Sequence, residues 1–286
     1  MTTKHPPSDL QVADALRASG YLFEQEVATL LETLGFHVET NSAFLDLELE
    51  KSRELDVRAI KVIHDDKENH LQVIVELLVE CKDAEAPFVF VTRSKNVREI
   101  HNPKPTEYLF PRREYTRHLT AKTFQEVPAF LHFDLPTHHY YYREAEKATQ
   151  FAKIVRKGSE WQATHEGVYD SLILPMAKAL EARRLAVKDM VKGSIHRSVW
   201  LFFPIVVLSG SLLSVKAGEK PVAVTHRKRV SFVRELQSEV LSGHYLTDFV
   251  TFESLQSFVE LELLQFAGQV AELARNEPKQ VRGDEA

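Results

Sequence analysis

The sequence predicts an α/β fold in which a mixed central sheet is flanked by helices. Two apolar runs predict buried strands, because residues 73–82 are rich in valine and residues 197–208 are almost entirely apolar. Three other segments, at 20–34, 168–191 and 255–270, carry apolar residues at helical spacing. Strands of this kind, interleaved with amphipathic helices, are typical of a sheet covered by helices.

The chain is expected to form one domain. Its 286 residues, 44% hydrophobic and 27% charged, are ordinary for a soluble globular protein with a substantial core. Six of the twelve prolines lie between Pro87 and Pro136, and a stretch so rich in proline cannot form long helices. We therefore predict a single domain over 1–286, with core segments 20–92 and 143–275, an irregular proline- and aromatic-rich insertion at 94–142, and polar tails at 1–10 and 276–286.

Local patterns predict the elements that follow the first strands. Residues 86–93 predict a further strand, and residues 143–157 predict a helix because four apolar residues recur there at helical spacing. In 197–218 we expect a buried strand, a turn at Ser209–Gly210 and the return strand of a hairpin. The tyrosines at 140–142 are expected to pack in the core, with stacking on unpaired bases or a membrane-facing role as the alternative. We expect no zinc site at His138 and His139, because adjacent residues diverge on an extended chain and no cysteine-rich spacing lies nearby.

The most informative pattern joins two carboxylates and a lysine. Asp56 is followed by Glu80 and Lys82 at the end of the valine-rich strand, where alternation puts Glu80 and Lys82 on one face and Cys81 on the other. Two charges that close an apolar strand are costly to bury alone, so we expect a polar cleft there. Such a set can bind a divalent metal and activate water, although Glu80 and Lys82 also fit an ordinary ion pair worth about 0–1 kcal/mol.

The order of these residues resembles the PD-(D/E)xK nuclease superfamily. The segments GYLFEQEVATLLETLGFHVET, ELDVRAI and VIVELLVECKD resemble its helix and first strand, its second strand with the Asp, and its third strand ending in Glu-x-Lys. Leu55 stands where the family often has proline. The resemblance covers roughly residues 20 to 92 and implies a restriction-endonuclease-like αβββαβ core, in which a helix crosses over after the third strand to another strand of the sheet.

The resemblance also implies roles for these residues. Asp56, Glu80 and the backbone carbonyl of Cys81 would coordinate Mg²⁺, for which Mn²⁺ can substitute, and Lys82 would position or help to deprotonate the attacking water. Glu24 and Glu26 lie on opposite margins of the helical stripe, so helical geometry does not choose between them. The pairing of Phe23 with the acid in many family members favours Glu24, and a solvated carboxylate remains the alternative.

The remaining features concern compartment. Cys81 is the only cysteine, so no disulfide forms within the chain, and its place on the covered face predicts a small buried side chain. Residues 1–10 contain no apolar signal core, and Pro204 with the turn at 209–210 leaves too short an apolar run for a membrane span. We expect a cytoplasmic protein.

The charge balance restricts how nucleic acid is bound. The net charge is −5, from 36 basic and 41 acidic residues, which argues against a DNA-packaging or RNA-coating role but allows binding through a local patch. Two basic clusters are candidates for phosphate contacts, ranked slightly above Arg112, Arg113 and Arg117, and each is otherwise a solvated face. They are Arg183, Arg184 and Lys188, and Arg227, Lys228 and Arg229.

Two hypotheses for function follow. The first is a Mg²⁺-dependent endonuclease that hydrolyses DNA in bacterial restriction, defence or DNA processing, with RNA as an alternative substrate that the sequence does not distinguish. A homodimer is plausible for it, because a one-site enzyme that cleaves both strands of a duplex usually uses two protomers. The second is a binding or scaffold protein that keeps a nuclease-like fold without catalysis.

Overall fold

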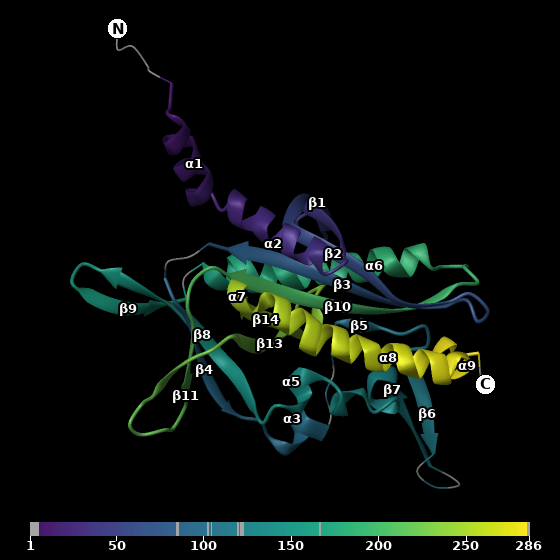
Figure 1. The fold of residues 1–286 in the computed structure, drawn as a ribbon. Helices are drawn as coiled ribbons and strands as arrows, with labels where there is room; N and C mark the ends of the chain where they lie inside the picture. The colour runs from purple at the N-terminus through teal and green to yellow at the C-terminus, as the bar shows by residue number, and fades with distance from the viewer. Residues whose placement is uncertain are drawn as a thin grey trace.

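A computed structural model of the chain describes residues 6–83, 86–101, 103, 105–118, 120, 123–165 and 167–284. Over these residues the fold is α/β, with a large mixed sheet flanked by helices (Figure 1). The strand order along the sheet is β1-β2-β3-β10-β14-β13-β8-β4-β11-β12, with β5 added to β10 and β9 added to β8. The fold class predicted from the sequence is confirmed at this level.

The first part of the sheet is an antiparallel meander that follows two helices. Its elements are α1 (Asp9–Ala18), α2 (Tyr21–Thr33), β1 (His37–Asp46), β2 (Lys51–Asp66) and β3 (Leu71–Lys82). The predicted helix and three strands are all present in the predicted order. Gly35 adopts a φ of 78° directly after α2, a left-handed conformation that glycine takes without strain, so the chain leaves the helix there and turns into β1.

The meander continues into two parallel strands. β10 (Arg197–Leu208) pairs with β3 along its whole length, from Arg197 opposite Leu71 to Leu208 opposite Lys82. The last four residues of β10 also pair in parallel with β14 (Ser242–Thr251). Ten of the twelve residues of β10 are buried, as expected for a central strand with helices on both faces.

Helices cover the two faces of these central strands (Figure 1). On one face α2, α7 (Phe252–Phe258) and α8 (Leu264–Asn276) pack on the odd-numbered residues of β3, such as Val75 and Val79. On the other face α6 (Leu174–Met190) packs on the even-numbered residues, such as Ile74. The alternation predicted for this strand is therefore observed, with both faces apolar over most of its length.

The proline-rich insertion contains only short elements, as predicted. They are α3 (Val97–His101), β5 (Tyr108–Leu109), β6 (Glu114–His118), β7 (Phe124–Pro128), α4 (Ala129–His132), a 3₁₀ turn (Leu135–Thr137) and α5 (Tyr140–Arg143). Its aromatic end packs in the core: His139, Tyr140 and Tyr141 are buried, and His139 hydrogen-bonds the hydroxyl of Tyr108 at 2.5 Å. Core packing is therefore confirmed for Tyr140 and Tyr141, whereas Tyr142 is partly buried and His138 is exposed.

The second part of the sheet corrects the predicted helix at 143–157. These residues instead form β8 (Glu146–Lys157), which pairs with β4 (Phe88–Ser94), β9 (Glu160–Thr164) and one residue of β13 (Arg229–Gln237). The apolar residues fit a helical period, and only four of the twelve residues of β8, namely Thr149, Phe151, Ile154 and Val155, favour strands, so local propensity does not decide the outcome. The pairing of β8 with β4 and the packing of Phe151 on Phe90 decide it.

The predicted hairpin after β10 is also wrong. β11 (Leu212–Lys216) does not return along β10, but pairs in parallel with β4 and antiparallel with β12 (Val224–His226). Both edges of the C-terminal half of β10 are already occupied by β3 and β14. The chain must therefore leave β10 after Leu208 and find an edge elsewhere in the sheet.

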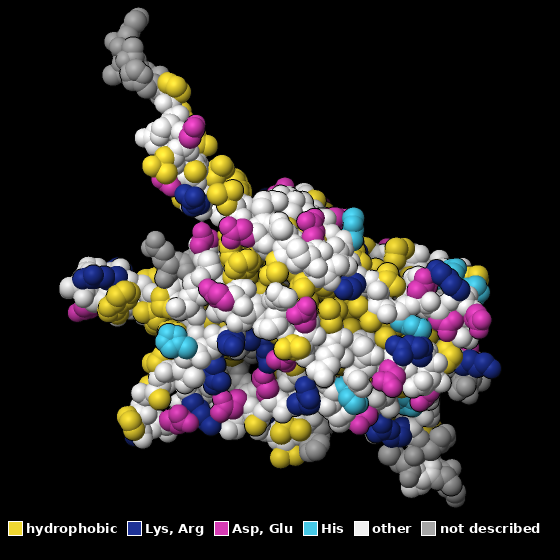
Figure 2. Space-filling view, in the orientation of Figure 1, with side chains coloured by type: hydrophobic (Ala, Val, Ile, Leu, Met, Phe, Trp, Pro, Cys, Tyr) yellow, Lys and Arg dark blue, Asp and Glu magenta, His cyan; other side chains and the backbone are white. Residues whose placement is uncertain are grey.

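The ends of the described chain differ from each other. The expected N-terminal tail falls partly on residues 1–5, which lie outside the described residues, and partly on α1, whose residues are all at least partly exposed, with Leu10, Val12 and Leu16 among the exposed apolar side chains (Figure 2). The expected C-terminal tail is partly ordered, because α9 (Pro278–Arg282) buries Val281 in the core. No helix within the described ranges is long and apolar enough to span a membrane.

Candidate functional site

The site predicted from the sequence lies where the pairing between β2 and β3 ends. The ladder between these strands stops at Val57 opposite Val79, so the backbone N–H of Cys81 has no partner in the ladder. The side chain of Asp56 takes that place, and its Oδ2 accepts a hydrogen bond from the Cys81 N–H at 2.7 Å. A carboxylate that accepts a backbone N–H has a fixed orientation, so Asp56 is held beside the end of β3.

Glu80 and Lys82 lie next to this point and contact each other. Lys82 Nζ donates to Glu80 Oε1 at 2.6 Å. The side chains of Glu80 and Lys82 are 15% and 29% exposed, so the pair is largely covered while still open to solvent on one side. The structure therefore brings together the two strand residues on one face, as predicted, and it also shows the ion pair that the sequence allowed as the alternative.

The structure distinguishes Glu24 from Glu26. Glu24 lies in the first turn of α2 and is partly buried, whereas Glu26 is exposed. Burial raises the pKa of Glu24, repulsion from Asp56 raises it further, and attraction to Lys82 opposes both effects. These electrostatic interactions with Asp56 and Lys82 indicate that Glu24 lies near the carboxylates, and its role there stays a prediction.

Burial raises the pKa of all three carboxyl groups, those of Glu24, Asp56 and Glu80. Burial is the main cause that raises the pKa of Asp56 and of Glu80, and the charge of Asp56 raises the pKa of Glu80 further. Burial also raises the pKa of Cys81, so its thiol stays protonated and is not a nucleophile. Carboxylates that repel one another in a partly covered site gain stability when a cation binds between them.

The oxygen atoms of Asp56, Glu80 and the Cys81 carbonyl are of the type that binds magnesium, but they are not arranged as a ready metal site. Carboxylate and carbonyl oxygens are the ligands that Mg²⁺ prefers. Across the described part of the chain, however, no three His, Cys, Asp or Glu side chains lie close enough together to hold a metal ion. One oxygen of Glu80 faces Lys82 and one oxygen of Asp56 faces the Cys81 amide. Asp56 and Glu80 fit the ion by type, because each uses one carboxylate oxygen for its present partner and has a second oxygen that could bind the ion.

One lysine of this site was missed by the sequence analysis. Lys153 on β8 is close enough to Lys82 that repulsion between them, together with burial, lowers the pKa of Lys153. Its ammonium also lies 5.0 Å from the ring centroid of Phe88. The sequence pattern places this residue on a helix that does not form. If residues 146–157 are taken as a strand, the alternation of side chains predicts that Lys153 points out from one face of the sheet.

The basic residues predicted on α6 are engaged within the protein. Arg183 donates through Nε to Glu76 Oε1 at 2.6 Å, and Glu76 is fully buried. Arg184 forms an ion pair with Glu181, which also accepts a hydrogen bond from the hydroxyl of Tyr245. Lys188 lies further along α6, toward the end of the sheet where β3 begins. Their role as phosphate contacts stays a prediction.

The second basic cluster lies at the same end of the sheet as the carboxylates. Arg229 is opposite Val250, Val250 is opposite Val207, and Val207 is opposite Cys81. Arg229 is thus three strands from Cys81, roughly 14 Å at the usual strand spacing. It forms an ion pair with Glu144. The neighbouring pair Arg227 and Lys228 is exposed, and Arg227 donates to Ser214 Oγ at 2.7 Å.

Comparison with protein-family models, with curated proteins and with solved structures gave no match to this chain.

Proposed function

We propose that the protein is a divalent-metal-dependent nuclease of the PD-(D/E)xK type that hydrolyses DNA phosphodiester bonds. The observation that carries the proposal is the position of Asp56, held by the Cys81 N–H at the end of β3 beside the Glu80–Lys82 pair. The sequence order of these residues and their meeting at one strand end both support it. Restriction or defence, cytoplasmic location and a homodimer that cleaves both strands belong to the same proposal.

The order and direction of the core helices and strands support this proposal. α2 precedes three antiparallel strands, α6 follows them, and β10 then runs parallel to β3. With the elements from β4 to β9 that lie between β3 and α6 set aside, this is the order helix, three strands, helix and strand that the resemblance implies. The fold alone does not establish a reaction, so the proposal rests on the residues at the strand end.

The proposed reaction gives each residue one task. A bond forms between a water oxygen and phosphorus, while the bond from phosphorus to one sugar oxygen breaks and that oxygen takes up a proton. Asp56, Glu80 and the Cys81 carbonyl would hold Mg²⁺, which supplies positive charge against the phosphate oxygens. Lys82 stabilises the charge that develops on phosphate and helps to orient the water. Glu24 accepts a hydrogen bond from that water.

The test is cleavage of supercoiled plasmid, linear duplex, single-stranded DNA and RNA with millimolar Mg²⁺ or Mn²⁺. Lys82→Ala is expected to lower the rate by about 100-fold or more, the usual loss when a general acid-base group is removed. Lys67→Ala is the matched control, because Lys67 is an exposed lysine in the turn between β2 and β3. Equal rates for Lys82→Ala and the parent, with both folded, would show that the assignment is wrong.

A non-catalytic scaffold is the second candidate, and one observation favours it. Glu80 already faces Lys82, and no ready metal cluster is present in the portion of the chain that is described. Metal binding separates the two candidates, since an ion that binds only the folded protein raises its stability by about 2.7 kcal/mol at a concentration 100 times its Kd. The nuclease predicts that millimolar Mn²⁺ raises the melting temperature of the parent but not of Asp56→Asn. The scaffold predicts no change in either.

A further inference from the structure

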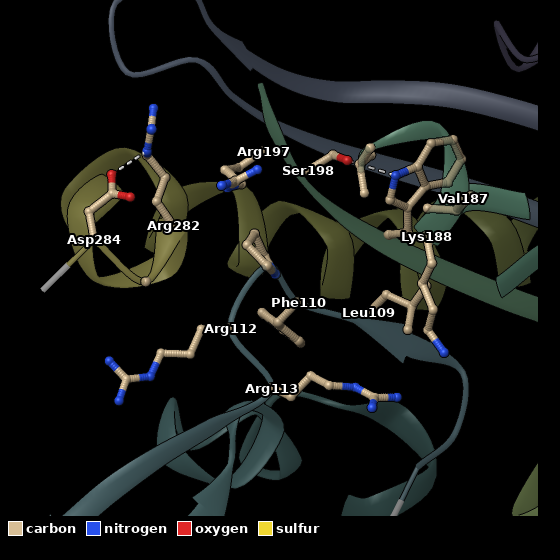
Figure 3. Close-up of a pocket in the computed structure, with 14 residues that line it drawn as sticks. Leu109, Phe110, Arg112, Arg113, Val187, Lys188, Arg197, Ser198, Arg282 and Asp284 are labelled. Carbon is tan, nitrogen blue, oxygen red and sulfur yellow. Dashed lines mark hydrogen bonds and ion pairs between the residues drawn. The ribbon is translucent and has the colours of Figure 1, made fainter. Parts of the chain in front are cut away.

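A cavity lies far from the carboxylates. It has a volume of about 540 Å³, and its walls come from the N-terminal end of β10, the last turns of α6, the segment after β5, and α9 (Figure 3). Arg197 at this cavity is opposite Leu71, whereas Leu208 is opposite Lys82. Eleven residues separate these two rows, roughly 36 Å along an extended strand. The cavity therefore cannot share one small ligand with the Asp56–Glu80 site.

The floor of the cavity is apolar. Trp200 and Leu109, which are opposite each other on β10 and β5, line it with Phe110, and Val187 and Val191 of α6 complete it. Trp200 is held in place because its indole Nε1 donates to Ser198 Oγ at 2.8 Å. Apolar and aromatic surfaces of this kind cover the hydrophobic part of a ligand, with a few polar groups to orient it.

The rim of the cavity is cationic. Five of its fourteen lining residues are basic, and Asp284 is the one carboxylate among those that the structure describes. The basic residues are Arg112, Arg113, Lys188, Arg197 and Arg282. Arg282 donates to Asp284 and Arg197 donates to the Ser194 carbonyl. A cavity with such an excess of positive charge attracts an anion more strongly than it attracts a neutral or cationic ligand.

Two of these cations form no ion pair among the described residues. Within those ranges no hydrogen bond or ion pair involves the side chain of Arg113 or of Lys188. Figure 3 shows both charged ends extending on the same side of the cavity. Burial, together with repulsion from Arg184 and Arg113, lowers the pKa of Lys188 against a weaker attraction to Glu181. Arg113 is exposed and Lys188 is half-buried, and an anion placed between them would be attracted by both charges.

The close fit of the C-terminal segment shows that the cavity wall is tightly packed. Gly283 has a φ of 77°, and a Cβ at this position would lie 2.7 Å from Cβ of Arg112. Only glycine allows this close approach. The end of α9 is thereby held against the segment after β5, and residues far apart in the sequence close the same cavity.

We propose that this cavity binds a nucleoside polyphosphate, with its phosphates between Arg113 and Lys188 and its ring against the floor at Trp200. The volume lies within the range of ligand pockets, about 300–1,000 Å³, and the division into a cationic rim and an apolar floor matches the two halves of a nucleotide. Duplex DNA is a worse match, because the apolar floor offers nothing to a phosphate backbone. The site goes beyond the proposed nuclease activity and does not depend on it.

The experiment measures binding of ATP, inorganic pyrophosphate and a short DNA duplex in EDTA, so that no divalent ion occupies the carboxylates. The sequence has two tryptophans, and Trp161 is an exposed residue of β9. In a Trp161→Phe background the fluorescence therefore reports on Trp200. We expect ATP to change this fluorescence saturably and pyrophosphate to compete with ATP.

The decisive variant is Arg113→Ala with Lys188→Ala. It is expected to weaken ATP binding by about tenfold or more for each charge removed. Arg156→Ala with Lys157→Ala is the control, because these residues are exposed near the β8–β9 turn and the change in net charge is the same. Unchanged ATP affinity in the Arg113 and Lys188 variant would overturn the proposal. So would a duplex that binds through these two residues while ATP does not bind.

Discussion

Replacing Arg183 by alanine is expected to destabilise the fold rather than to weaken DNA binding directly. Glu76 on β3 is fully buried and accepts from Arg58 Nε at 2.6 Å, from Arg183 Nε at 2.6 Å and from Arg183 Nη2 at 3.3 Å. This cluster joins α6 to β2 and β3. Because Arg183 is only 23% exposed, its guanidinium is held largely inside the protein.

The expected loss in the free energy of unfolding depends on which hydrogen bonds to Glu76 remain in each variant. Arg183→Ala removes two charge-assisted hydrogen bonds but leaves Glu76 paired with Arg58, so we expect a loss of about 2 kcal/mol. For a chain of this size that loss lowers the melting temperature by roughly 3 °C. Glu76→Ala leaves two guanidinium groups facing each other without their carboxylate, and a cost of about 3–5 kcal/mol is expected.

The assay is urea unfolding of the parent, Arg183→Ala, Glu76→Ala and the exposed control Arg156→Ala. The control should lie within about 0.5 kcal/mol of the parent, and a double-mutant cycle should show coupling of about 1 kcal/mol or more between Arg183 and Glu76. DNA affinity is then measured at low temperature, where all variants are folded. Arg183→Ala that is as stable as Arg156→Ala but binds DNA more weakly would refute the reasoning.

Three further predictions follow from the structure. Lys153→Ala is expected to slow DNA cleavage by about tenfold, because its loss removes a positive charge near Lys82, and steady-state kinetics would detect it; an unchanged rate would remove Lys153 from the site. Arg227→Ala with Lys228→Ala should weaken DNA binding on all sequences and reduce the salt dependence by about one unit for each phosphate that is no longer neutralised, whereas an unchanged salt slope would mean a solvated turn. Burial raises the pKa of Asp248 to about 6, so between pH ~4 and about 6 its native carboxyl holds a proton that unfolding releases. Its contribution to stability is therefore present below pH ~4 and lost as the pH rises through about 6. The parent should lose stability over this range relative to Asp248→Asn, as urea unfolding at several pH values would show, and parallel curves would contradict this.

The pattern of apolar residues predicted correctly those strands that are buried on both faces and those helices that bury one face. β3 and β10 are buried on both faces, so their apolar runs predicted strands. α2 and α8 each cover one face of the sheet, so an apolar stripe predicted helices. Asp56, Glu80 and Lys82 were found for the same reason, because charges at the end of an apolar strand are conspicuous in the sequence and β2 pairs directly with β3.

Long-range pairing decided the elements that local pattern missed. β8 is mostly of intermediate exposure, so its apolar residues fit a helical period as well as a strand, and its pairing with β4 fixes it as a strand. β11 pairs with the other side of β4, because β10 has no edge available at its C-terminal half. Because residues 143–157 were predicted to form a helix, nothing in the sequence indicated that Lys153 lies near Lys82. The error in the fold therefore became an omission in the site.

The cationic cavity shows a different limit, since none of its residues is unusual in the sequence. Its basic residues come from the segment after β5, from α6, from β10 and from α9, and the most distant are Arg112 and Arg282. In the sequence, Arg113 groups with Arg112 and Arg117, which rank below the two candidate clusters, and Lys188 groups with Arg183. In the structure Arg183 instead pairs with Glu76. A net charge of −5 also conceals the arrangement, because binding depends on local potential rather than on the total. Only folding separates the carboxylates at one end of β3 from the cations at the other. For this reason each end can be tested with a variant that leaves the other intact.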